Sequence, residues 1–167
     1  MAEMLTPVGQ KKMNWHVALI YFILWLVAIM DLFNGLVGVF GVQAAPTADG
    51  GIGFALHTYP DMTHPQIFIL DGVFLLLMSM YAVFVRFQLA GFKRRAPVYL
   101  MILFLLNVAE SIAFTAALYA LVPDMVAANI ERGSNPLIST AVNATVSLVT
   151  AGLTWIYYQR RKELFTK

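Results

Sequence analysis

The sequence predicts an all-α integral membrane protein, a four-helix antiparallel transmembrane bundle with both termini in the cytoplasm. Hydrophobic residues make up 60% of the 167 residues and charged residues only 12%, which is about half the charged share of a soluble domain. The apolar residues are concentrated in four runs, each long enough as a helix to cross a hydrocarbon core of ~30 Å. Basic residues flank these runs, as the positive-inside rule requires of cytoplasmic segments.

One domain accounts for the whole chain, 1–167, because four spans leave no room for a soluble domain beside them. The expected spans are residues 15–41, 66–91, 97–121 and 136–158. Residues 42–65 and 122–135 are the expected outer loops, and the first is rich in Gly and Pro and contains no Lys or Arg. The first run is too long for the apolar region of a signal peptide, so we expect it to stay in the protein.

The first expected helix ends in a glycine series, Gly35, Gly38 and Gly41. Glycine lets the backbone of a neighbouring helix approach closely, so we expect these residues to serve helix packing. His16, at the start of the same helix, is expected at the level of the lipid headgroups. Since the spans contain no second histidine, paired axial ligation of haem is excluded.

A basic turn, Phe92-Lys93-Arg94-Arg95-Ala96-Pro97, joins the second and third expected helices. Burying three consecutive cations in lipid would be costly, so this turn must stay in water. Arg86 can extend its side chain toward the turn, so we expect it to need no buried partner. The third helix carries a row of small residues that predicts a packing edge: Ala109, Ala113 and Ala117.

The basic residues predict the orientation of the chain. Of the 11 Lys and Arg residues, ten fall on the side of the two termini and only Arg132 lies opposite. Both termini should therefore be cytoplasmic. The residues that set this topology are Lys93, Arg94, Arg95, Arg160, Arg161 and Lys162. Because the basic residues flank apolar runs and form no groove with stacking aromatics, we expect the lipid bilayer as a partner and not nucleic acid.

Polar residues inside the apolar runs are the candidate site, since each is costly in lipid unless it faces a partner or a wet cavity. They are Asp31, Asn34, Asp71, Asn107, Glu110 and Asn143. At ~1.5 Å per residue from the basic ends, four of them lie at a similar height, roughly 20–27 Å above the cytoplasmic boundary. If they face inward, they form a shared acidic pocket open to the outer side. Its three carboxyl groups could not all ionise unless a cation filled the site.

A second interpretation assigns these residues separate structural roles. Asp71 would cap the start of the second helix or stay wet at the interface, and Asp31 and Asn34 would hydrogen-bond to neighbouring helices. Glu110 would be a neutral interhelical donor or would face a partner subunit. The sequence leaves this choice open.

Catalytic and metal chemistry is not expected. The chain has no Cys, no GxSxG, no Walker loop and no HExxH motif. In the first outer loop, His57 and His64 accompany Asp49 and Asp61, but their spacing matches no zinc-ligand pattern. We therefore expect a protein that is not an enzyme, with no catalytic residue, metal or cofactor.

Three local motifs lie at helix ends. They are Pro65-Gln66-Ile67-Phe68-Ile69-Leu70-Asp71, Phe92 through Tyr99, and Trp155-Ile156-Tyr157-Tyr158 followed by Arg160-Arg161-Lys162 and Phe165. Taken in register, they resemble the small four-helix bacterial inner-membrane family of unknown function that includes YdgK. The resemblance implies a multi-pass protein of the bacterial inner (cytoplasmic) membrane, and it implies no established activity.

Two functions fit these features. The first is an accessory or structural subunit that packs against a larger membrane complex, since the packing edges are prominent and a catalytic motif is lacking. The alternative is an oligomeric transporter or channel component in which Asp31, Asp71 and Glu110 handle protons or a cation. The expected protein partners are accordingly other membrane subunits or further copies of this chain.

Overall fold

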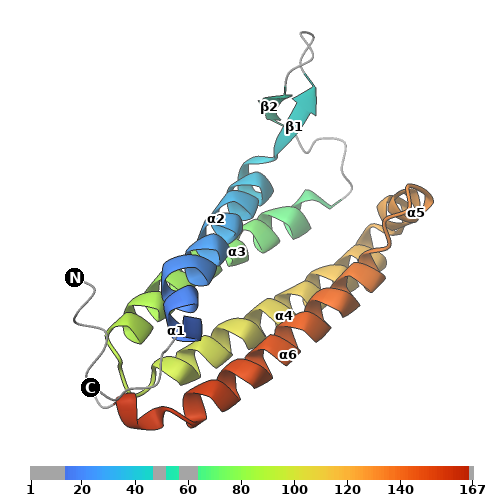
Figure 1. Cartoon of the computed structure of the whole chain (residues 1–167). Helices are drawn as coiled ribbons and strands as arrows, with labels where there is room; N and C mark the ends of the chain where they lie inside the picture. The colour runs from blue at the N-terminus through green and yellow to red at the C-terminus, as the bar shows by residue number, and fades with distance from the viewer. Residues whose placement is uncertain (1–13, 47–51, 57–63, 166–167) are drawn as a thin grey trace.

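The computed structural model describes residues 14–46, 52–56 and 64–165, and these form mostly helices (Figure 1). Their order is α1 (Asn14–Ala18), η2 (Leu19–Ile23), α2 (Leu24–Phe40), β1 (Val42–Pro46), β2 (Ile52–Leu56), α3 (Pro65–Ala90), α4 (Ala96–Leu121), α5 (Pro123–Glu131), α6 (Pro136–Gln159) and η4 (Lys162–Leu164). Four helices are long and apolar enough to cross a membrane: Asn14–Phe40, α3, α4 and α6. The prediction of four long apolar helices is therefore confirmed.

Local sequence explains where these helices begin and end. Proline occupies one of the first two positions of α3, α4, α5 and α6, where its missing N–H removes no helical hydrogen bond. The Asn135 side chain caps α6 by accepting hydrogen bonds from the backbone N–H groups of Leu137 and Ile138. Gly41 ends α2 in the left-handed conformation with φ 64°, and its N–H donates to Val37 O at 2.8 Å.

The first long helix contains a π-helical turn, η2, that the sequence did not reveal. Arg86 of α3 contacts this turn, because its Nε donates to the backbone oxygen of Ile20 at 3.3 Å. Its guanidinium also lies over the rings of Trp25 and Phe87, at 5.0 and 4.8 Å from their centroids. The expectation that Arg86 needs no buried partner is wrong. Its side chain reaches the first long helix, where these contacts take the place of hydration by water.

Helix α2 lies beside α3, and α4 lies beside α6, while α3 and α4 connect the two pairs (Figure 1). The backbones of α2 and α3 meet where Gly35 and Gly38 face Gly72, which agrees with the packing role expected for the glycines. A Cβ atom added to Gly72 would lie 2.7 Å from Val39 N and 2.8 Å from Gly35 O. In the other pair, the hydroxyl oxygens of Thr115 and Thr140 are 2.6 Å apart.

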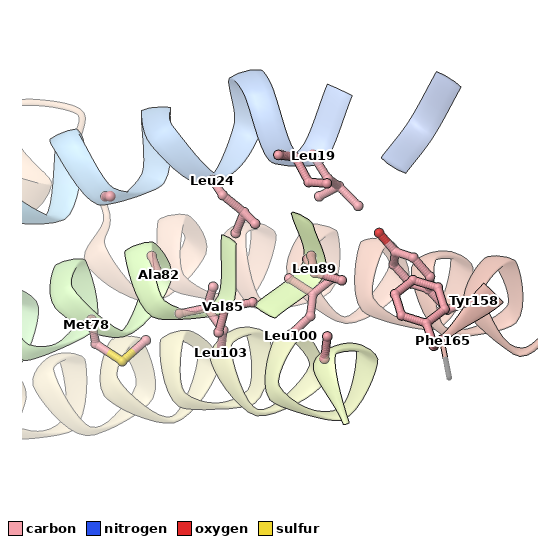
Figure 2. Packing of buried hydrophobic residues seen from close by; sticks show 13 residues of the cluster. Leu19, Leu24, Met78, Ala82, Val85, Leu89, Leu100, Leu103, Tyr158 and Phe165 are labelled. Carbon is pink, nitrogen blue, oxygen red and sulfur yellow. The ribbon is translucent and has the colours of Figure 1, made fainter. Parts of the chain in front are cut away.

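The main hydrophobic cluster lies toward the turn between α3 and α4 (Figure 2). It joins the start of the first long helix, the second half of α3, the start of α4 and the end of α6. Its members include Leu19, Leu24, Met78, Ala82, Val85, Leu89, Leu100, Leu103, Tyr158 and Phe165. Close packing of these side chains gains dispersion energy, so this end holds the helices together.

The α3–α4 turn, the start of the first helix and the end of α6 meet at this same end of the molecule. Phe92 lies in the turn with φ 52°, and its ring is 4.9 Å from His16 and 5.6 Å from Phe165. His16 is only 2% exposed and shares a 2.9 Å hydrogen bond with the Tyr158 hydroxyl. These aromatic rings enclose His16, and its level relative to the lipid headgroups stays a prediction.

Both connections expected to be loops contain regular structure. In the first, β1 and β2 pair antiparallel, with Val42 opposite Leu56 and Pro46 opposite Ile52. In the second, α5 starts at a proline with Asp124 in its first turn, where a carboxylate complements the helix dipole. His57, Asp49 and Asp61 lie outside the described residues, as do Lys11, Lys12 and Lys167.

Candidate functional site

A cavity of about 600 Å³ lies between α2, α3, α4 and α6. It is in the half of the helices farther from the α3–α4 turn, beyond the hydrophobic cluster. All six polar residues singled out in the sequence line it: Asp31, Asn34, Asp71, Asn107, Glu110 and Asn143. The four long helices thus bring the polar residues of their apolar segments to one place.

Asp31 of α2 is the most enclosed acid of the cavity. Its side chain is 8% exposed, and its Oδ2 atom has no hydrogen-bond partner within the described part of the chain. Buried polar atoms are normally hydrogen-bonded, because leaving one unpaired costs about 1–3 kcal/mol or more for a charged group. Asp31 therefore has an open position for a proton, a cation or a hydrogen-bond donor that enters the cavity.

Asp71 of α3 and Glu110 of α4 lie next to each other in the wall of the cavity. Both are half-buried, and their side chains are within hydrogen-bonding reach. Two carboxyl groups can form a hydrogen bond only when one of them carries a proton. Asp31 adds electrostatic repulsion on Glu110, so the three acids form one interacting set.

The separate capping role considered for Asp71 is wrong. Helix α3 begins at Pro65 with His64 at its N-cap position, and its first turn contains no acidic residue. Asp71 therefore lies too far along the helix to reach the free N–H groups at its start. His64 instead pairs with the neighbouring Gln66 side chain at 3.1 Å.

Amide and hydroxyl groups complete the polar lining. The Asn107 Nδ2 atom donates to Leu103 O at 3.3 Å, which orients the amide within its own helix. Asn34 and Asn143 are exposed, so the cavity is open at these residues. The lining also includes Ser111 and Ser147, each one helical turn after a cavity asparagine and therefore on the same helix face.

Two aromatic rings that the sequence reading missed form part of the cavity wall. Phe68 and Phe114 line the cavity, and their ring centroids are 5.9 Å apart in a T-shaped contact. Phe68 precedes Asp71 by three residues and Phe114 follows Glu110 by four, so each lies on the same helix face as an acid. That spacing was the available signal.

The cavity is not arranged as a chelating metal centre. Among the described residues, no group of three or more His, Cys, Asp and Glu side chains is placed to hold a metal ion.

No protein-family model, curated protein or solved structure matches this chain. The chemistry of the cavity therefore carries the functional argument.

Proposed function

We propose that the protein is a multi-pass membrane protein that handles protons or a cation through the acidic cavity, as a component of a homo-oligomer or a larger assembly. The observation that carries this proposal is the buried Asp31, whose Oδ2 atom is unpartnered in a cavity shared with Asp71 and Glu110. Ionisable residues within membrane spans are costly and mark ion or proton pathways. If Asp31 served only to stabilise the fold, its Oδ2 atom would be expected to have a hydrogen-bond partner among the described residues.

The proposed topology is an antiparallel bundle with both termini on the cytoplasmic side of a bacterial inner membrane. It is supported by two basic clusters, Lys93 to Arg95 and Arg160 to Lys162, which flank the same end of the helices. The contact between Phe92 and Phe165 brings these clusters together. In this orientation the cavity lies in the outer half of the membrane. We further propose that the chain belongs to the YdgK-like proteins, on the motifs of the sequence alone.

The test is cation flux into proteoliposomes that contain the purified full-length protein. A pH-sensitive dye reports proton entry under an imposed membrane potential, and Na⁺ and K⁺ replace protons in parallel assays. We expect Asp31→Asn and Glu110→Gln to lower the flux to that of protein-free liposomes, because each removes an ionisable carboxyl group at nearly constant volume. Glu131→Gln, at an exposed acid of α5, is the matched control and should keep the wild-type flux.

Two results would overturn the proposal. One is a wild-type flux no greater than that of protein-free liposomes for all three cations. The other is an unchanged flux in both cavity variants. Size-exclusion elution must match the wild type, and Asp71→Asn replaces any variant that does not fold.

The accessory-subunit function is the second candidate, and it is supported by a specific surface. Ala109 and Ala113 of α4 are exposed, and small residues of this kind allow a partner helix to approach. Purification from native membranes in mild detergent tests this function. Stoichiometric unrelated subunits, lost on Ala113→Phe, would support it, and a particle containing only this chain would exclude it.

A further inference from the structure

A second hollow lies on the outer surface of α3 and α4, next to the acidic cavity. This groove has a volume of about 540 Å³ and is almost entirely apolar. One side consists of larger residues of α3, such as Leu70 and Phe74, and the other consists of the alanine row of α4. Because Leu70 is 68% exposed, the groove is accessible from the side of the molecule.

The groove and the cavity share the same three residues: Asp71, Glu110 and Phe114. These side chains therefore separate the polar cavity between the four helices from the apolar groove on the outer surface of α3 and α4. The carboxyl groups of Asp71 and Glu110 can be reached from the groove as well as from the cavity. An occupant of the groove would place a polar or charged end directly at the acids.

The chemistry of both spaces identifies one class of occupant. The cavity offers carboxyl groups, amides and the rings of Phe68 and Phe114, which are the groups that attract an organic ammonium ion. Its volume far exceeds that of a bare ion, and the described acids do not form a metal-binding group. The groove offers methyl and methylene groups, which pack against an alkyl tail by van der Waals contact.

We infer that the site binds an amphiphilic organic cation, with its ammonium head at Asp71 and Glu110 and its apolar tail in the groove between α3 and α4. The buried Asp31, with its unpartnered Oδ2, supplies a third acceptor on the cavity side. This inference rests on the proposed cation-handling function and names its substrate class. A neutral lipid or a partner helix would fill the groove but would leave the acids without a counter-charge.

Equilibrium binding to the full-length protein in phosphatidylcholine nanodiscs tests the inference, with empty nanodiscs as the blank. The probes are dodecylammonium and 1-dodecanol, which share the same tail and differ in the charge of the head. We expect saturable binding of dodecylammonium with one site per chain. Binding of 1-dodecanol should be weaker by roughly tenfold to a hundredfold, the usual effect of losing a charged hydrogen bond.

Two variants separate the contributions of head and tail. Glu110→Gln should weaken dodecylammonium binding by roughly tenfold or more. Ala113→Leu puts a larger side chain into the groove and should weaken the binding of both probes by about tenfold, because the added methyl groups clash with the tail. Ala120→Leu is the matched control, because Ala120 is an exposed alanine of α4, and it should leave both affinities unchanged.

Equal affinities for the two probes would overturn the inference and indicate a site for neutral lipid tails. Unchanged dodecylammonium binding in either Glu110→Gln or Ala113→Leu would also overturn it. A second copy or another subunit, cross-linked at residue 113 and blocking both probes, would show that the groove is a protein interface. Dodecylammonium binding without cation flux would contradict the transport proposal alone, and flux without dodecylammonium binding would contradict this inference alone.

Discussion

The contact between α2 and α3 at Gly72 allows a quantitative test of how the acidic cavity is held together. In Gly72→Ala, the new Cβ would be 2.7 Å from Val39 N, 2.8 Å from Gly35 O and 2.8 Å from the carbonyl carbon of Gly38. Ordinary contacts begin near 3.4 Å, so the shortest contact requires a shift of about 0.7 Å (3.4 − 2.7). All three atoms belong to the backbone of α2, so the whole helix must move away from α3.

Overpacking of this kind costs about 1–3 kcal/mol, whereas replacing Gly by Ala inside a helix contributes about 1 kcal/mol of stability. Gly152→Ala separates these two effects, because a Cβ at Gly152 has no neighbour within 4 Å. Both variants receive the propensity gain, so their difference isolates the steric cost. We expect Gly72→Ala to be less stable than Gly152→Ala by about 1–3 kcal/mol. Unfolding by titration with dodecyl sulfate, followed by circular dichroism, measures the difference, and equal stability of the two variants would refute the close backbone contact.

Three further substitutions test other contacts by the same unfolding measurement. Asn135→Ala removes the side-chain cap of α6 and should cost about 0.5–2 kcal/mol. Faster hydrogen exchange in the first turn of α6 should accompany this loss, and unchanged exchange there would argue against the cap. Tyr158→Phe removes the hydrogen bond to His16 and should cost about 1–3 kcal/mol. The exposed Tyr21→Phe is its control, and equal stability of these two would contradict a buried pair. Arg86→Lys loses the planar group over Trp25 and Phe87 and should cost about 1 kcal/mol; a neutral result would mean that the lysine ammonium replaces these contacts.

The four long helices could be predicted because their apolar runs exceed the length that a membrane requires, and this pattern needs no knowledge of the packing. The acids were identified for a related reason, because a charged side chain inside an apolar run is destabilising unless it faces a partner or a wet cavity. Counting residues from the basic ends placed Asp31, Asp71 and Glu110 at one height, and the cavity contains all three. That count could not show which way each side chain points.

The particular partners that packing brings to Arg86 and His16 were not predictable. The partner of Arg86 is a backbone oxygen in a π-helical turn, and neither the turn nor its alignment with α3 has a local sequence pattern. His16 is buried because Phe92 and Phe165, far apart in the chain, approach it at the end of the molecule where α3 turns into α4. The hairpin β1–β2 has weak local signals, since five-residue strands in a Gly- and Pro-rich stretch resemble a loop.

The distribution of contacts explains why the acids remain accessible. Glycine contacts hold α2 against α3, and the Thr115–Thr140 hydrogen bond links α4 to α6. The large apolar side chains that join the two pairs lie toward the α3–α4 turn. Beyond that cluster, the Phe68–Phe114 contact links α3 to α4, but the cavity between the pairs is also lined by acids and amides, which apolar packing does not draw together. A cation between Asp31 of one pair and Glu110 of the other would add an attraction between the pairs in this half, so the site and the opening between the helix pairs are one feature of the fold.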